Sequence, residues 1–191
     1  MILMNMNYYS EEELNELGFR SLGKDVKISK KASIFDTEKI EVGDHTRIDD
    51  FCIISGQIIF GSYNHITPMC LVAGGEPGIF FSDFCTLAYG VKIFSQSDDY
   101  SGETLVNSLI PKKYKIEKKE SVFLGKHVVV GANSVVFPGV RLAEGSSVGA
   151  MTLVTKNTDP WGIYLGIPAR RVKERKKDLL KLETQFLKES T

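Results

Sequence analysis

Residues 124–154 read LGKHVVVGANSVVFPGVRLAEGSSVGAMTLV, and every sixth residue of this stretch is aliphatic: Leu124, Val130, Val136, Leu142, Val148 and Val154. A period of six fits neither an amphipathic helix, which repeats about every 3.6 residues, nor a half-buried strand, which alternates. It fits a solenoid in which each hexad supplies one short strand and one turn, and stacked coils bury the aliphatic position in a shared interior. The stretch therefore predicts a β-solenoid.

The same register continues upstream, with apolar residues at Val42, Ile48, Ile54, Phe60, Ile66, Val72, Phe81, Leu87 and Ile93. The fifth hexad position is mostly small, which suits a second side chain in a narrow core; its residues are Thr46, Cys52, Cys70, Cys85, Val91, Val128, Ser134, Val140, Ser146 and Thr152. The pairs Asp44-His45, Lys126-His127 and Ala132-Asn133 suit tight turns with unusual backbone angles. We therefore expect an all-β repeat domain.

The charge balance argues against several classes of partner. The chain has 24 Lys and Arg against 24 Asp and Glu, so no electrostatic case for nucleic acid or an anionic membrane follows. The segment Met1 to Asn7 lacks the features of a secretory signal, and no apolar stretch is long enough to span a bilayer. We expect a cytoplasmic protein without a membrane span.

The repeats are flanked by two helical segments. Ser10 to Glu13 reads as a capping box that opens a short helix, so residues 1–25 are expected to form an N-terminal cap. Residues 26–172 are expected to form the β-helix, with an extruded loop at 95–121. Residues 173–191 are expected to form a C-terminal helix with Leu179, Leu182 and Phe186 on one face, covering the open end of the solenoid.

Cys52, Cys70 and Cys85 all occupy the small inward position of their hexads. A catalytic or redox thiol needs access to solvent, whereas a thiol buried among apolar groups is inert. The three cysteines are therefore predicted to be core residues.

The six-residue period stops after Ile93, and the excursion from Ser95 to Ser121 carries Asp98, Asp99 and Glu103 before the register resumes. A long departure from a regular scaffold is a common place for function, although a solvated surface loop has the same appearance.

The hexads, the loop and the closing Trp161-Gly-Ile-Tyr-Leu-Gly-Ile-Pro-Ala-Arg170 together resemble the hexapeptide-repeat acyltransferases. The resemblance runs from about Val26 onward and implies a left-handed parallel β-helix, a homotrimer with active sites between subunits, and an acyl-CoA donor such as acetyl-CoA. The loop sequence from Ser97 to Gly102 looks closest to sugar O- and N-acetyltransferases of surface-polysaccharide biosynthesis that act on nucleotide-linked amino sugars.

Most members of this family carry a histidine base on the loop, and this chain has none there. Asp98 or Asp99 stands where the base is expected, with Glu103 close by. An ordinary aspartate, with a pKa of about 3.9, is a weak base toward a sugar hydroxyl but an adequate one toward an amine, so the acceptor is predicted to be an amine. Thr86 is a candidate oxyanion donor and His65, which points outward from its strand, a further candidate site residue.

The resemblance also implies that coenzyme A lies along the C-terminal coils. Small residues would let the pantetheine arm approach the backbone, and basic residues would meet its phosphates. The candidates for contact with the pantetheine arm are Gly131, Ala132, Gly149 and Ala150. The candidates near the phosphates are Lys156, Pro168, Arg170 and Arg171. Tight turns explain the glycines equally well, and the Gly-rich stretch from Ala73 to Gly78 is only a weak phosphate-loop candidate.

Three alternatives remain open. The enzyme acylates a sugar hydroxyl instead of an amine, or the solenoid binds ligands without catalysis. A third reading is a metal enzyme resembling the γ-class carbonic anhydrases, which would need His45, His65 and His127 to converge on zinc. Their hexad positions argue against convergence, so we expect no metal site.

Overall fold

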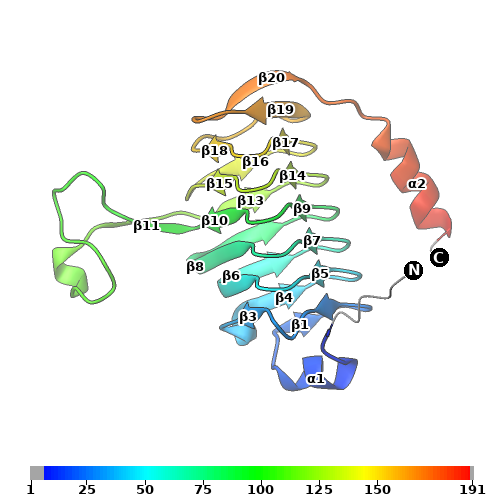
Figure 1. Cartoon of the computed structure of the whole chain (residues 1–191), viewed down its shortest axis with the longest axis horizontal. Helices are drawn as coiled ribbons and strands as arrows, with labels where there is room; N and C mark the ends of the chain where they lie inside the picture. The colour runs from blue at the N-terminus through cyan, green and yellow to red at the C-terminus, as the bar shows by residue number, and fades with distance from the viewer. Residues whose placement is uncertain (1–6, 190–191) are drawn as a thin grey trace.

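The computed structural model describes residues 7–189. The expectation made for Met1 to Asn7 falls almost entirely outside this range, as do the last two residues of the expected C-terminal helix. Figure 1 shows short strands stacked in coils, with one long arm leaving the stack on one side and a helix lying along the other. The chain therefore forms the parallel β-helix that the hexads predict.

Two sheets make the walls of the solenoid, and one of them bends around a corner. The larger sheet contains β1 (Ser21–Leu22), β3 (Ser33–Ile34), β4 (Ile40–Val42), β6 (Ile53–Phe60), β8 (Leu71–Phe81), β10 (Lys92–Phe94), β13 (Val122–Leu124), β15 (Val135–Val136), β16 (Arg141–Leu142) and β18 (Leu153–Val154). The other contains β2 (Lys27–Ile28), β5 (Arg47–Ile48), β7 (His65–Ile66), β9 (Thr86–Leu87), β14 (Val129–Val130), β17 (Ser147–Val148), β19 (Gly162–Leu165) and β20 (Arg170–Glu174).

The coil strands pair in parallel and in register, so equivalent hexad positions lie directly above one another. Ile48, Ile66 and Leu87 form one such inward column, and all three side chains are fully buried. The small inward residues are also buried, and their polar atoms donate to carbonyl groups of the next coil: Thr46 Oγ1 to Gly61 O at 2.8 Å and Ser134 Oγ to Gly149 O at 2.8 Å. The predicted core, including the three cysteines, is confirmed.

The corners of the coils use left-handed backbone conformations at ordinary residues. His45, His127 and Asn133 have φ angles of 56°, 61° and 57°, as expected for the turn pairs. At one corner this conformation stacks the rings of His45, Tyr63, Phe84 and His127 in a column, with centroids 4.7 to 5.3 Å apart.

Helix α1 (Glu11–Glu16) covers the N-terminal end of the stack. It begins with the predicted capping box at Ser10 and buries Leu14 against the first coil. The C-terminal helix α2 (Leu179–Glu189) begins later than expected, because Arg170–Glu174 continue as β20 and pair antiparallel with β19.

The expectation that the C-terminal helix covers the other end of the stack is wrong. That helix lies along the side of the coils (Figure 1), where Glu183 pairs with His127 and Phe186 packs on Tyr63 and Phe84. No helix among residues 7–189 is long and apolar enough to cross a bilayer.

The stretch at 95–121, here called the arm, projects from the coils beside β10 (Figure 1). Strands β11 (Gln96–Asp98) and β12 (Glu117–Lys119) pair antiparallel at its base, and its tip contains the 3₁₀ turn η2 (Lys112–Tyr114). A second 3₁₀ turn, η1 (Thr37–Lys39), precedes β4.

Candidate active site

The base of the arm encloses a cavity of about 260 Å³, here called the arm-base cavity. Strand β11, the next part of the arm and three coil residues supply its lining, which consists of Phe94, Gln96, Ser97, Asp98, Tyr100, Phe137 and Pro138. Asp98 is the one carboxylate in this lining. The cavity therefore combines apolar rings with a single acidic group.

Asp98 has few partners inside the chain. Its Oδ2 accepts a long hydrogen bond from the Asn107 amide at 3.3 Å, and Lys115 Nζ lies 3.8 Å from Oδ1. Lys115 is held more closely by Glu117, at 2.8 Å. The Asp98 side chain is 37% exposed, so one face of the carboxylate is open to a ligand.

Asp99 is engaged in the local structure of the arm. Its oxygens accept from the Ser101 amide at 2.8 Å, Ser101 Oγ at 2.9 Å, the Thr104 amide at 3.2 Å and Thr104 Oγ1 at 3.0 Å. These hydrogen bonds, with the Ser101 amide first, lower the pKa of Asp99. A carboxylate that is already satisfied and has a lowered pKa is a poor proton acceptor, so the geometry favours Asp98 over its neighbour.

Glu103 lies farther out on the arm and is exposed. It lines a shallow hollow of about 490 Å³ with Thr104, Lys113 and Tyr114, apart from the arm-base cavity. The structure does not bring Glu103 together with Asp98 in one cavity.

His65 and Thr86 are cross-strand neighbours on β7 and β9, in the second sheet. Figure 1 shows the arm pointing away from these strands. A single chain therefore places the predicted site residues in two groups, one on the arm and one on this sheet.

His65 is part of a network that the sequence analysis missed. Its Nε2 lies 2.8 Å from Asp49 Oδ2, and Asp49 Oδ1 also accepts from Arg47 Nε at 2.6 Å and from the Tyr8 hydroxyl at 3.0 Å. Burial opposes ionisation of Asp49, but the hydrogen bonds outweigh it and lower its pKa.

An ionised Asp49 only accepts hydrogen bonds, so His65 donates to it from Nε2. The sequence signal was present, since Asp49 follows the inward Ile48 and Arg47 stands in register with His65. The contact between Asp49 and His65 was not predicted because the two residues belong to different coils.

The residues proposed for coenzyme A lie on the last coils. Gly131 and Gly149 face neighbouring coils closely: a Cβ on Gly131 would meet Ala150 N at 2.4 Å, and one on Gly149 would meet Leu165 Cδ2 at 2.0 Å. Coil stacking therefore requires Gly131, whose neighbours are backbone atoms, whereas the neighbour of Gly149 is the end of a leucine side chain that can move. Ala150 and Lys156 are exposed, and Ala132 is half-buried.

The closing segment forms a hairpin on the last coil. Gly166 O accepts from the Leu153 amide at 3.1 Å, and the Ala169 amide donates to Leu153 O at 2.8 Å, so Pro168 lies in the turn between two anchored residues. Arg170 and Arg171 follow on β20 and are exposed. Arg171 is paired with Glu174 at 2.6 Å.

The histidines do not converge on a metal. The rings of Tyr63 and Phe84 stand between His45 and His127 in the stacked column. Across residues 7–189, no group of three or more His, Cys, Asp or Glu side chains is arranged to hold a metal ion.

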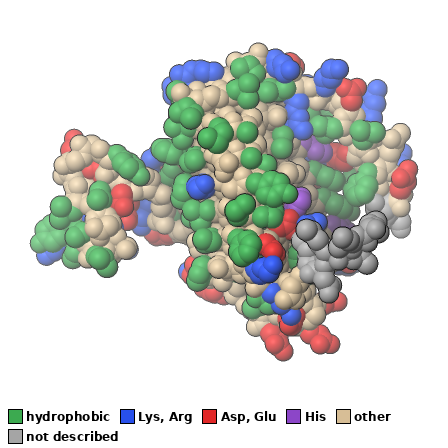
Figure 2. Space-filling model, viewed as in Figure 1, with side chains coloured by type: hydrophobic (Ala, Val, Ile, Leu, Met, Phe, Trp, Pro, Cys, Tyr) green, Lys and Arg blue, Asp and Glu red, His purple; other side chains and the backbone are tan. Residues whose placement is uncertain are grey.

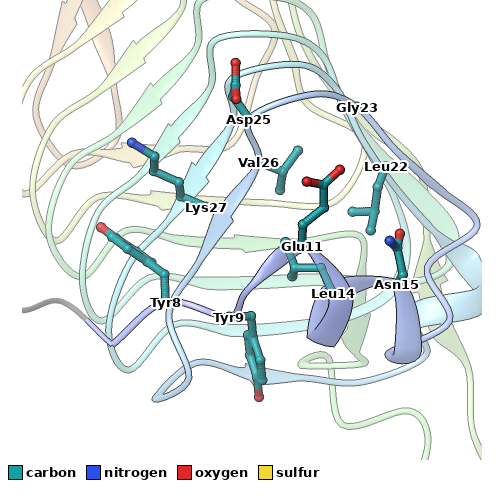
Figure 3. A pocket seen from close by; sticks show the side chains of 10 residues that line it. All are labelled: Tyr8, Tyr9, Glu11, Leu14, Asn15, Leu22, Gly23, Asp25, Val26 and Lys27. Atoms are coloured by element: carbon teal, nitrogen blue, oxygen red, sulfur yellow. The ribbon is translucent and has the colours of Figure 1, made fainter.

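A further cavity of about 380 Å³ lies at the N-terminal end, between α1 and the first coil (Figure 3). Leu14, Leu22 and Val26 contribute apolar side chains, whereas Glu11 and Lys27 contribute charged ones. None of the predicted site residues lines it.

No family model matches this chain. It is 39% identical over 184 residues to the dTDP-4-amino-4,6-dideoxy-D-glucose acyltransferase of Escherichia coli, over 95% of each chain. AntD, an N-acyltransferase from Bacillus cereus solved with dTDP and 3-hydroxybutyryl-CoA, matches at 46% identity and a TM-score of 0.95, over 97% of this chain and 99% of that one. A variant of AntD solved with dTDP-4-amino-4,6-dideoxyglucose and coenzyme A has the same identity and TM-score, over 96% and 98%.

A maltose O-acetyltransferase from Clostridium difficile 630 shares only the fold, at 20% identity and a TM-score of 0.56, over 87% of this chain and 75% of that one. The much higher identity to the E. coli protein extends over almost the whole of both chains. The chain therefore belongs to the family of acyl-CoA-dependent acyltransferases that includes the E. coli enzyme and AntD.

Proposed function

We propose that this enzyme transfers an acyl group, with acetyl as the first candidate, from coenzyme A to the amine of a dTDP-linked amino-dideoxy sugar, and that Asp98 is the base. The relatives act on or bind such compounds. The observation that carries the assignment of the base is the contrast between two adjacent aspartates: Asp98 lines a cavity with an open face, whereas Asp99 is saturated by the arm.

The chemistry requires two proton transfers from the acceptor nitrogen and one exchange of bonds at the thioester carbonyl carbon. The acceptor ammonium gives a proton to the Asp98 carboxylate, and the free amine then attacks the thioester carbonyl carbon. The new C–N bond forms as the C–S bond breaks, the nitrogen gives up a second proton, the leaving thiolate takes that proton, and the amide and free coenzyme A are released. A donor to the carbonyl oxygen lowers the barrier by stabilising the charge that develops there, and Thr86 is proposed for that position.

The site is completed by a second copy of the chain in this proposal. The arm points away from the His65 and Thr86 strands of its own chain, so Asp98 meets those residues only across a subunit boundary. The outward column of the larger sheet is largely apolar, with Ile53, Leu71, Val135 and Leu153 in register-related positions. Figure 2 shows hydrophobic side chains over much of one face of the coil stack. Both observations support contact between copies of the chain, and the homotrimer proposed here is the assembly that the family resemblance implies.

Coenzyme A is proposed to bind at the C-terminal coils. Lys156, Arg170 and Arg171 are exposed there and would meet its phosphates, beside the turn that contains Pro168. Ala132, Gly149 and Ala150 are proposed to leave the corner of the coil open to the pantetheine arm, whereas Gly131 is required for stacking.

The test is thiol release from acetyl-CoA with dTDP-4-amino-4,6-dideoxyglucose, against a matched dTDP-hexose that has only hydroxyl groups. Release with the amine alone supports N-acylation, and release only with hydroxyl sugars establishes O-acylation. If neither acceptor causes thiol release and coenzyme A does not bind, the protein is a ligand-binding solenoid without this catalytic activity.

The base is tested by comparing Asp98→Asn with Asp99→Asn. We expect Asp98→Asn to lower kcat by about 100-fold or more, and Asp99→Asn to have a smaller effect through a looser arm. The reverse order would overturn the assignment. Light scattering of the wild type should give three times the chain mass of 21.3 kDa.

A further inference from the structure

A polar cavity of about 500 Å³ adjoins the arm-base cavity, and Gln96 lines both. We refer to it as the amide cavity. Its polar side chains come from four separate segments of the chain and are Asp36, Lys39, Ser55, Gln57, Glu76 and Gln96. It lies where β6 and β8 run continuously through a corner instead of making a hexad turn.

Two side-chain amides in this cavity have unused hydrogen-bonding groups. Within residues 7–189, no hydrogen bond involves the side chain of Gln57 or Gln96, and both residues are half-buried. Each amide offers two N–H donors and one carbonyl acceptor. A pair of half-buried amides without protein partners is suited to a ligand that both donates and accepts.

The Gly-rich stretch on β8 explains how the amides are accommodated. A Cβ on Gly75 would lie 2.0 Å from Gln96 Oε1, and a Cβ on Gly78 would lie 3.3 Å from Gln57 Cγ. The glycines thus leave room for the two glutamine side chains. This assigns a role to a motif that had suggested only a weak phosphate loop.

The charges of the cavity favour a neutral polyhydroxyl group over a diphosphate. Lys39 is the one basic side chain that lines it and is paired with Asp36 at 3.0 Å, while Glu76 is paired with Lys119 at 3.0 Å. A diphosphate would find both carboxylates and both ammonium groups already paired with each other, so none of these described side chains offers it an uncompensated positive charge. Sugar hydroxyls, which donate and accept, match the amides without a charge conflict.

Gln96 and Asp98 stand two positions apart on β11, so their side chains lie on the same side of the strand. A ring bound at Gln96 therefore presents its substituents to Asp98. We infer that Gln57 and Gln96 bind the hydroxyl groups of the acceptor sugar ring and set specificity for it. This inference rests on the proposed function, since it takes the acceptor to be a nucleotide-linked amino sugar.

The experiment uses the full-length protein with Gln57→Leu and Gln96→Leu, and Gln185→Leu on the exposed face of α2 as the matched control. Each cavity variant should raise KM for dTDP-4-amino-4,6-dideoxyglucose about tenfold, the effect of one lost hydrogen bond of roughly 1.4 kcal/mol, with KM for acetyl-CoA unchanged. Equilibrium binding of dTDP, which lacks the sugar, should be the same in wild type, cavity variants and control.

Three outcomes separate the possibilities. Weaker binding of dTDP itself by the cavity variants would overturn the inference, because the amides would then contact the nucleotide. Unchanged KM for the amino sugar would also overturn it. Failure of the wild type to acylate the amino sugar would instead reject the proposed function, and comparing the binding of dTDP-sugar with that of dTDP would still report on the amides.

Discussion

Replacing Gly131 with alanine should destabilise the protein through a clash between coils. The added Cβ would lie 2.4 Å from Ala150 N and 2.6 Å from Gly149 C, about 1 Å inside ordinary contact. Relief requires the two coils to separate at a point where the Gly131 amide donates to Val148 O at 2.7 Å. An opening of about 1 Å stretches that hydrogen bond beyond its normal range.

The magnitude follows from these two losses. Overpacking against a fixed neighbour costs about 1–3 kcal/mol, and loss of one buried backbone hydrogen bond costs about 1 kcal/mol. The variant should therefore lose about 3 kcal/mol. For a chain of this size each kcal/mol corresponds to about 2–4 °C, so Tm should fall by about 10 °C.

The assay is thermal unfolding followed by fluorescence and circular dichroism, with Gly18→Ala as the control. Gly18 has a φ of 70° and open space around the position of a Cβ, so alanine there adds backbone strain without a clash. That strain costs about 1–2 kcal/mol. A Gly131→Ala variant that melts within 2 °C of wild type would refute the stacking argument. An increased KM for acetyl-CoA in the folded variant would instead support contact with the pantetheine arm.

Other predictions concern the C-terminal helix and the thiols. Glu183 Oε2 lies 2.9 Å from His127 Nε2. Burial opposes ionisation of Glu183, but hydrogen bonds from Lys126 and His127 outweigh it and lower its pKa. Glu183→Gln should therefore lower Tm at pH 7. The difference in Tm between the variant and the wild type should disappear as the pH falls below about 4, where the carboxylate of the wild type becomes protonated. A constant difference in Tm down to about pH 3 would contradict this. Phe186 meets Tyr63 and Phe84 edge-on, so Phe186→Ala should cost about 1–2 kcal/mol in urea unfolding; Leu182→Ala, at a more exposed position of α2, should cost less. Burial raises the pKa of Cys85 to about 12, and all three cysteines are buried. Ellman's reagent at pH 8 should therefore label no thiol until the protein is unfolded. Rapid labelling of the native protein would show that the core is accessible to the reagent.

The fold could be predicted because each hexad shows by itself which of its residues point into the core and which form the turn. The inward aliphatic and small positions, the left-handed turn residues and the Ser10 capping box are local features, and the structure bears out each of them. The start of α2 was placed at residue 173 because the charged stretch that follows reads as helix by itself, yet Lys173 and Glu174 belong to β20. Pairing with β19 makes these residues part of a strand.

The sequence by itself determined the solenoid, its buried core and the arm that interrupts it, because a six-residue burial period is visible in any single stretch. Only the tertiary structure separated Asp98 from Asp99, which are adjacent in sequence but differ in their hydrogen-bond partners. It also brought Gln57 beside Gln96 and Asp49 beside His65, across different coils. The physical reason is that the neighbours of a side chain come from other coils of the solenoid, which lie far away in the sequence. The hexad pattern predicts whether a side chain points inward or outward, but it does not predict which residues of the other coils contact it.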